Sequence, residues 1–189
     1  MQRAKLTTLE TVSGRLVDLL APTVEDISFD DIAFSLSRLN RYTGHAGVYS
    51  VAQHSCLVAD LLPSEHRVHG LLHDATEYAT GDLSSPMKIA LATACPAFRP
   101  AFRVLEGNFR AVIYAKAGVA LPSAEVESLV KKADMTALAM EQRDVMRSPN
   151  VWNVPEIDES ARRYVVPLNE HDAYHAFAQA LTDCGINVA

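Results

Sequence analysis

The chain has 189 residues, of which 49% are hydrophobic, and a formal net charge of −6 at pH 7. This length and apolar content are enough for a core, so we expect residues 1–189 to fold as a single domain. The negative charge disfavours non-specific binding to nucleic acid, and no apolar run approaches the ~18 residues that a membrane span needs. Three scattered cysteines outside any CxxC pair indicate reduced thiols and a cytoplasmic location.

Helix-start residues, glycines and prolines divide the chain into a series of helices. Residues 11–24 are predicted to be an irregular start with a short hairpin, and Asp30 is predicted to cap the first helix. The segment 41–50 reads as a loop, and 149–167, which holds Trp152, as irregular surface structure with a weak strand pattern at 151–154. The predicted helices are 31–40, 51–62, 65–80, 86–93, 102–117, 124–147 and 170–183. The predicted fold class is therefore all-α, a compact helical bundle.

The stretch Gly70 to Lys88, GLLHDATEYATGDLSSPMK, concentrates ionisable residues in a pattern that favours a metal site. His73 and Asp74 are adjacent, and Glu77 follows four residues after His73. On a helix this spacing places Glu77 on the His73 face, while Asp74 lies about 100° around the axis. Polar groups beside Leu71–Leu72 are costly to bury unless they coordinate or hydrogen-bond something. A lone His-Asp pair is common, so the prediction depends on its neighbours.

Two further residues complete a candidate ligand set. His54 lies on the preceding predicted helix, and Asp134 lies on the apolar stripe of the predicted helix 124–147. An aspartate on such a stripe is unusual because burying it unpaired is costly, and a metal ion would remove that cost. Two nitrogen and two oxygen ligands suit a divalent ion such as Mn, Co, Fe, Zn or Mg, and the predicted set is His54, His73, Asp74 and Asp134.

The order H…HD…D, with HDxxE and then GD, resembles the HD-domain phosphohydrolases. The pattern is most similar to the YfbR-like bacterial 5′-deoxynucleotidases, and the phage dATP triphosphohydrolases share its layout. The resemblance covers roughly residues 35–143. It includes the helix end SRLNRY, the SxxxH approach to His54, and GDLSSPMK, which is similar to GDLPTPVK in that branch. This chain departs from the family at Tyr42, where the family has tryptophan, and residues 148–189 form a C-terminal extension outside the resemblance.

The resemblance implies a helical HD-type fold, a divalent metal ion on the four ligands named above, and a catalytic Glu77. It also implies substrate contacts from Arg41, Tyr42, Asp82, Leu83, Ser84 and Ser85, and charge makes Lys88 a further candidate. The expected reaction is hydrolysis of a deoxynucleotide, either by a 5′-nucleotidase acting on dNMPs or by a dNTP triphosphohydrolase. We expect a homo-oligomer, a dimer or larger, with a small-molecule substrate and neither nucleic acid nor membrane as partner.

The residue types support this chemistry without the resemblance. A divalent ion lowers the pKa of its bound water toward ~7, and Glu77 could orient or deprotonate that water. Arg41 could clamp a phosphate through its planar guanidinium. Asp82 could protonate the leaving 5′-oxygen as a second catalytic residue, hold a sugar hydroxyl, or simply belong to a turn. The alternative is a catalytically silent module that binds metal and nucleotide, which would have no need of Glu77 and Asp82 together.

Other histidines have simpler interpretations. His69 lies four residues before the HD pair, but Gly70 follows it, so the segment is not an HExxH zinc motif. A half-buried surface role is favoured for it. His171 and His175 are also four residues apart, and we interpret them as one face of the C-terminal helix. His45, in the glycine-containing loop, is a candidate substrate contact.

Overall fold

The computed structural model describes residues 6–157 and 164–188, and in these ranges the regular secondary structure is helical apart from one small hairpin. Short 3₁₀ turns lie at Val24–Asp26, Tyr42–Gly44 and Ser64–His66, and a π-helical turn lies at Gln142–Met146. The predicted all-α, single-domain fold is confirmed. No helix in the described ranges is long and apolar enough to cross a membrane. The strands and helices are β1 (Thr8–Glu10), β2 (Leu16–Asp18), α1 (Phe29–Arg38), α2 (Val51–Asp60), α3 (Arg67–Leu72), α4 (Glu77–Thr80), α5 (Ser85–Ala94), α6 (Phe98–Ala117), α7 (Ala124–Glu141) and α8 (Glu170–Asp183).

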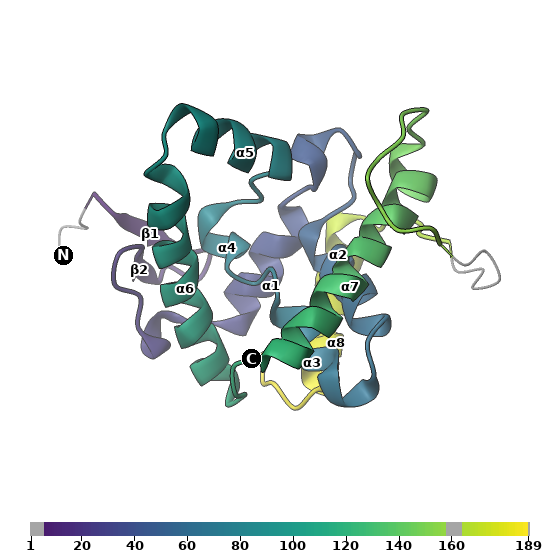
Figure 1. The fold of residues 1–189 in the computed structure, drawn as a ribbon. Helices are drawn as coiled ribbons and strands as arrows, with labels where there is room; N and C mark the ends of the chain where they lie inside the picture. Colours follow the sequence, from purple (N-terminus) through teal and green to yellow (C-terminus); the bar gives the residue numbers. More distant parts are fainter. Residues whose placement is uncertain (1–5, 158–163, 189) are drawn as a thin grey trace.

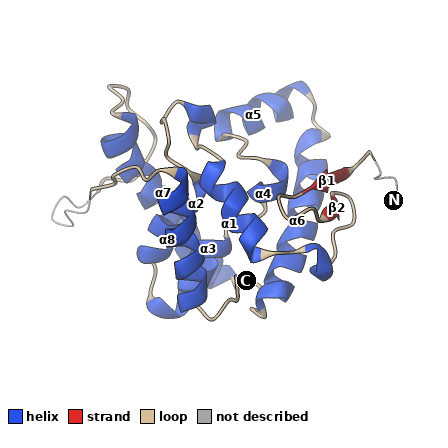
Figure 2. Cartoon of the chain, turned by 180° about the vertical axis from the view of Figure 1, so that it is seen from behind, coloured by secondary structure: helices blue, strands red, loops and turns tan. Residues whose placement is uncertain are grey.

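Helix α2 is central to the packing, because it contacts α1, α3, α7 and α8. These helices lie together on one side of the molecule, while α5, α6 and the hairpin lie on the other (Figure 1; Figure 2). One buried cluster joins α1, α6 and α8 through residues such as Leu36, Phe109 and Phe177. A second joins α2 to α7 through residues such as Val58 and Ala137. Burial of these apolar side chains is the main force that holds the helices in place.

Helices α2 and α3 approach closely because Gly70 has no side chain. A Cβ atom at Gly70 would lie 2.6 Å from the Cα atom of Ala59, closer than real Cβ atoms come to other heavy atoms. This approach brings His54, on α2, near His73, which follows α3, with ring centroids 5.2 Å apart. Glycine at position 70 therefore helps to set the distance between two predicted metal ligands.

The prediction of one helix over 65–80 is wrong, because α3 ends at Leu72 and α4 begins at Glu77. Between these helices, backbone N–H groups donate to the carbonyl three residues earlier, as Ala75 N–H does to the Leu72 carbonyl. In a continued α-helix the Gly70 carbonyl would accept from the Asp74 N–H. Here it accepts a hydrogen bond from His73 Nδ1 at 2.7 Å. This side-chain bond competes with the helical ladder, so Glu77 starts a separate helix instead of extending the His73 face.

The first helix begins earlier than predicted. Helix α1 starts at Phe29, and its N-cap is Ser28, whose hydroxyl accepts from the Asp31 N–H at 3.4 Å. Asp30, the predicted cap, instead accepts a hydrogen bond from the Tyr174 hydroxyl of α8. Serine and aspartate are comparable caps, so the tertiary contact with α8 decides which one is used.

Several other predicted boundaries also differ from the structure. Helix α6 begins at Phe98 and includes Pro100, because a proline in the first turn removes only an N–H that has no helical partner. The hairpin pairs 8–10 with 16–18 rather than lying within 11–24, and 151–154 forms no strand. The predicted helix 124–147 ends as α7 at Glu141 and continues as the π-helical turn.

Candidate metal centre

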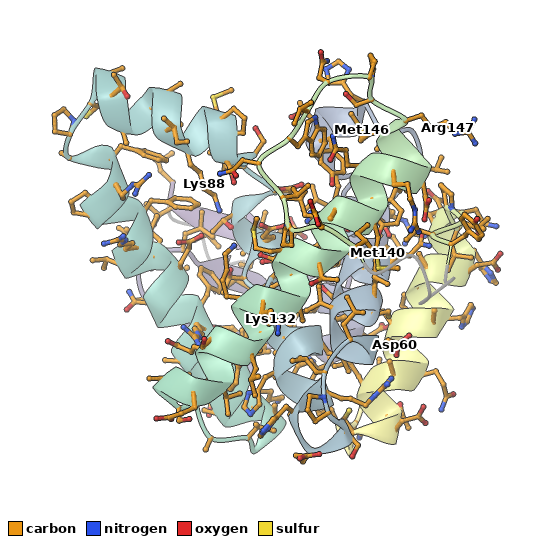
Figure 3. All side chains as sticks on the ribbon, turned by 45° about the vertical axis from the view of Figure 1, so that its right-hand side comes forward. Asp60, Lys88, Lys132, Met140, Met146 and Arg147 are labelled. Atoms are coloured by element: carbon orange, nitrogen blue, oxygen red, sulfur yellow. The ribbon has the colours of Figure 1, made fainter. Side chains whose placement is uncertain are left out.

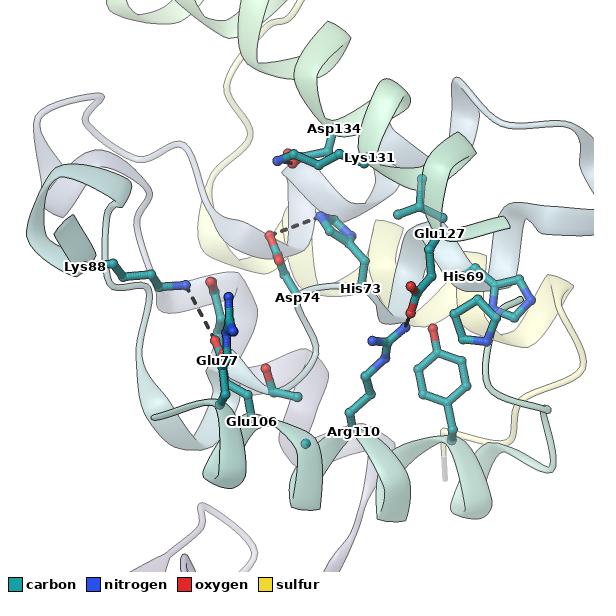
Figure 4. A pocket seen from close by; sticks show the side chains of 16 residues that line it. His69, His73, Asp74, Glu77, Lys88, Glu106, Arg110, Glu127, Lys131 and Asp134 are labelled. Carbon is teal, nitrogen blue, oxygen red and sulfur yellow. Dashed lines mark hydrogen bonds and ion pairs between the residues drawn. The ribbon is translucent and has the colours of Figure 1, made fainter. Parts of the chain in front are cut away.

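His54, His73 and Asp74 bring one candidate ligand atom each to within 4.8 Å of one another. Asp74 Oδ2 lies 3.1 Å from His73 Nε2 and 3.5 Å from His54 Nε2. Figure 4 shows the Asp74 carboxylate and the His73 ring pointing toward each other. His54 comes from α2, and the other two residues come from the turn between α3 and α4. Three of the four predicted ligands therefore form a group that could hold a metal ion.

The hydrogen bonds made by Nδ1 of the two histidines orient their rings so that both Nε2 atoms face this group. His73 Nδ1 faces the Gly70 carbonyl at 2.7 Å, so Nδ1 carries the proton and Nε2 is the acceptor. His54 Nδ1 faces Glu141 Oε1 at 2.5 Å, so Nδ1 carries a proton on this ring too, and His54 Nε2 could bind a metal ion once it gives up its own proton. Neither Nε2 atom has a hydrogen-bond partner within the described ranges. His73 Nε2 and Asp74 Oδ2 are then two adjacent acceptors, an arrangement that a cation between them makes favourable.

Asp134 lies beside this group rather than inside it. Its Oδ1 atom is 3.4 Å from His54 Nε2, and its Oδ2 atom is 2.8 Å from Lys131 Nζ. Burial alone would raise the pKa of Asp134, but contacts with His54 and Lys131 outweigh burial and hold it well below its usual range. Asp134 is therefore ionised and remains a candidate fourth ligand, which Lys131 would have to share with a metal ion.

Glu77 contributes a buried carboxyl group next to the ligand group. One of its carboxyl oxygens is buried and has no hydrogen-bond partner among the described residues. Burial, and then the charges of Asp74 and Asp82, raise the pKa of Glu77 well above its usual range. A carboxyl group whose pKa is strongly shifted, beside a candidate metal site, is typical of residues that take part in acid–base catalysis.

Glu141, the last residue of α7, is a fully buried carboxylate that sequence analysis did not identify. Its Oε1 atom contacts His54 Nδ1 and accepts from the Tyr49 hydroxyl at 3.0 Å. Its Oε2 atom accepts from Arg41, with Nε at 3.2 Å and Nη2 at 3.1 Å, and from the Tyr42 hydroxyl. Glu141 therefore connects a predicted metal ligand to two predicted substrate residues.

The environment keeps Glu141 ionised. Burial alone would raise its pKa, but His54 and Arg41 outweigh burial and lower the pKa of Glu141 to about 2. The sequence does contain a signal for this residue, since Glu141 follows Asp134 by seven residues, two helical turns, on the same face of the predicted helix.

The backbone around Tyr42 is held in an unusual conformation. Tyr42 has a φ of 57° and Thr43 a φ of 56°, in the left-handed region that residues other than glycine rarely adopt. Such backbone persists only where surrounding contacts fix it, and it is frequent at functional sites. Here the bonds to Glu141 fix Tyr42 and Arg41, and Arg41 Nη1 also lies 3.8 Å from Asp74.

A cavity of about 770 Å³ borders the ligand group. This volume is typical of small-molecule sites. His45, the further candidate contact from the loop, lies in its wall, as does Trp152 from the segment predicted to pack on the surface. The structure thus brings all the predicted substrate residues to one cavity, whose lining includes Arg41, Tyr42, Asp82, Leu83, Ser84, Ser85 and Lys88, together with Asp74, Glu77 and Asp134.

A second cavity, of about 430 Å³, lies between α6 and α7 and shares Asp74, Glu77 and Asp134 with the first (Figure 4). Two of its cations are paired with acids, with Arg110 2.7 Å from Glu127 and Lys88 3.5 Å from Glu106. His69 lines this cavity and stacks on Tyr114 of α6, and it is partly buried. His69 is thus a neighbour of the ligand group and not a member of it.

No protein-family model matches the chain, but two bacterial proteins are similar to it. YfdR of Escherichia coli (strain K12) is 35% identical over 178 residues, which cover 93% of this chain and 94% of YfdR. The chain belongs to the YfdR family. RCAP_rcc00048 of Rhodobacter capsulatus is 32% identical over 145 residues, which cover 71% of this chain and 70% of that protein. Because so little of the chain lies outside the YfdR match, the match extends across the segment 41–141 that carries the ligand group. Both relatives are described as uncharacterized, so an activity has to be argued from the site.

Proposed function

We propose that the chain is a divalent-metal-dependent phosphohydrolase that acts on deoxynucleotides. It either removes phosphate from a 5′-monophosphate or releases triphosphate from a dNTP. The observation that carries the proposal is that one cavity is bordered by the ligand group at Asp74, the buried carboxyl group of Glu77 and the cation Arg41. Metal, base and phosphate-binding cation are the parts that phosphate ester hydrolysis needs.

The chain's own residues have separable roles in this proposal. A divalent ion held by His54, His73 and Asp74 would supply an acidified water and a Lewis acid for a phosphoryl oxygen. Glu77 would accept the proton of the attacking water, because it is not needed as a ligand and carries a free oxygen. Arg41 would bind the phosphoryl group.

Local positive charge is essential because the chain as a whole has a charge of −6 and repels anions. Arg41 is held by Glu141 through Nε and Nη2, which leaves the Nη1 edge, 3.8 Å from Asp74, directed at the cavity. Lys88 and Lys131 line the same cavity and add two further cations. Lys88 is paired with Glu106 and Lys131 with Asp134, so a phosphate group would compete with these acids for the two lysines.

A catalytically silent binding module accounts less well for Glu77. A buried carboxyl group with an unpartnered oxygen destabilises the fold, and a module that only binds metal and nucleotide gains nothing from it. In an enzyme the same group is held free for proton transfer.

Product identification tests the proposal. The purified protein is incubated with each dNMP and each dNTP in the presence of Mn, Co or Mg, and phosphate and triphosphate are measured separately. Metal-dependent release of either product that falls in the Glu77→Gln variant would support the proposal. Nucleotide binding with no product from any substrate and metal would contradict it and favour the silent module.

A further inference from the structure

Trp152, the single tryptophan of the chain, lines the proposed substrate cavity. It belongs to the segment after α7, outside the motif region. Its ring centroid lies 5.6 Å from that of Tyr42, with the two planes at 51°, and the side chain is partly exposed. Tyr42 is itself anchored by Glu141 and by its left-handed backbone. Trp152 is therefore a partly exposed aromatic side chain supported by a fixed neighbour.

The cavity has a charged end and an apolar end. Along α7 its wall runs from Lys131 and Asp134 to Met135 and Leu138, and Met146 of the π-helical turn also lines it. With a rise of 1.5 Å per residue, Leu138 lies about 6 Å further along the axis than Asp134. Figure 3 shows Met146 at the end of α7 away from Lys132, where the chain turns back. The apolar lining is therefore displaced from the ligand group along α7, in the direction of the segment that carries Trp152.

The order of residues along the wall matches the order of groups in a 5′-nucleotide. The Arg41 guanidinium lies 5.3 Å from the Tyr42 ring, and the Tyr42 ring contacts Trp152. Phosphate at Arg41 and sugar at Tyr42 would leave the base at Trp152. Aromatic side chains bind bases by stacking on their flat faces, which every base offers.

We propose that Trp152 forms the nucleobase subsite of this cavity, with the base stacked on its indole ring. This inference rests on the proposed function, because it assigns the base end of the same substrate. The amide of the neighbouring Asn153, also in the cavity wall, supplies a donor and an acceptor for the edge of the stacked base.

The single tryptophan makes the proposal directly measurable, since all indole emission comes from Trp152. The Glu77→Gln variant, which should turn substrate over slowly, is titrated with dAMP, deoxyribose 5-phosphate or inorganic phosphate, with Mg²⁺ in every sample. Calorimetry on the same samples reports binding independently. We expect dAMP to change the emission saturably, and we expect deoxyribose 5-phosphate to bind without changing it. The same emission change with the base-free ligand would overturn the proposal.

Substitution of Trp152 supplies the second measurement. Loss of a base-stacking aromatic corresponds to roughly 5- to 150-fold weaker binding, so Trp152→Ala should raise the Kd for dAMP by that factor. Trp152→Phe should retain most of the affinity. Neither variant should alter the Kd for deoxyribose 5-phosphate, and an equal loss for both ligands would show a purely structural role and overturn the subsite.

The outcomes also separate this inference from the proposed function. Calorimetric binding of dAMP to the protein without any change in Trp152 emission would overturn the base subsite and leave the phosphohydrolase proposal standing. If neither dAMP nor the dNTPs bind with metal present, the proposed function fails, and the base subsite fails with it.

Discussion

Replacing Glu141 with glutamine should weaken metal binding more than its effect on folding alone would explain. The carboxylate is 0% exposed and accepts hydrogen bonds from Tyr49, Tyr42 and Arg41, besides facing His54. Glutamine keeps the shape but replaces one oxygen with an amide NH2 group, which donates hydrogen bonds and cannot accept them. It also removes the negative charge that compensates the buried Arg41.

The size of each effect follows from these contacts. A hydrogen bond to a charged group contributes about 1.5–3 kcal/mol, and breaking a buried ion pair costs about 3–5 kcal/mol, so we expect a destabilisation of about 3 kcal/mol. Loss of the group that orients a ligating histidine lowers metal affinity by about 10–100-fold. His54 is the ligand concerned, because Glu141 fixes the ring nitrogen that carries its proton.

Asp31→Asn is a matched control for the loss of a buried carboxylate. Asp31 is 2% exposed and accepts from the Thr11 and Ser13 hydroxyls at 2.8 and 2.7 Å, and it does not line the cavity at the ligand group. Denaturant unfolding would give both destabilisations, and calorimetric titration with Mn²⁺ would give both metal affinities. We expect both variants to lose stability and only Glu141→Gln to lose metal affinity. Wild-type Mn²⁺ affinity in Glu141→Gln would refute the reasoning.

Three further predictions concern proton release, packing and phosphate binding. Burial and Arg41 favour neutral His54, but Glu141 and Asp134 outweigh them and raise its pKa to about 9. Metal uptake at pH 7 must therefore displace a proton, and Mn²⁺ affinity should rise about tenfold per pH unit up to that pKa; a pH-independent affinity would contradict this. Gly70→Ala should lower the free energy of unfolding by about 1–3 kcal/mol, measured in denaturant, because the new Cβ atom would meet α2. Gly107→Ala on α6 should raise it by about 0.5–1 kcal/mol, because a Cβ atom there has nothing within 4 Å. Equal effects of the two substitutions would contradict the close approach of α2 and α3. Arg41→Ala should lower kcat/KM for the deoxynucleotide in steady-state kinetics by a factor that corresponds to a loss of about 2–5 kcal/mol of transition-state stabilisation. An unchanged kcat/KM would remove Arg41 as the phosphate ligand.

The predictable part of the site consists of residues that share a short motif. His73, Asp74 and Glu77 lie within five positions, so local spacing alone is enough to group them. Asp134 was recognisable because a carboxylate interrupts an apolar stripe. The structure brings these residues together around one cavity, and the hydrolytic activity itself stays a prediction.

The residues that sequence reasoning missed depend on packing between distant segments. Glu141 contacts Arg41 across 100 positions of the chain, and nothing near either residue indicates the pairing. Trp152 reaches the cavity only because the chain turns back after α7. The break after α3 was missed for a different reason, since one hydrogen bond from the His73 side chain to the Gly70 carbonyl competes with helical propensity.

The most direct test of the central claim is the turnover of Glu77→Gln at full metal occupancy. Bound metal per chain and the rate of phosphate or triphosphate release are measured on the same sample, beside the wild type. Glu77 is treated as the proton acceptor and not as a ligand, so the variant should keep its metal while its rate falls by about 10²–10⁴-fold. Loss of the metal would make Glu77 a ligand, and full turnover with the metal retained would remove it from the chemistry; either result would contradict the account.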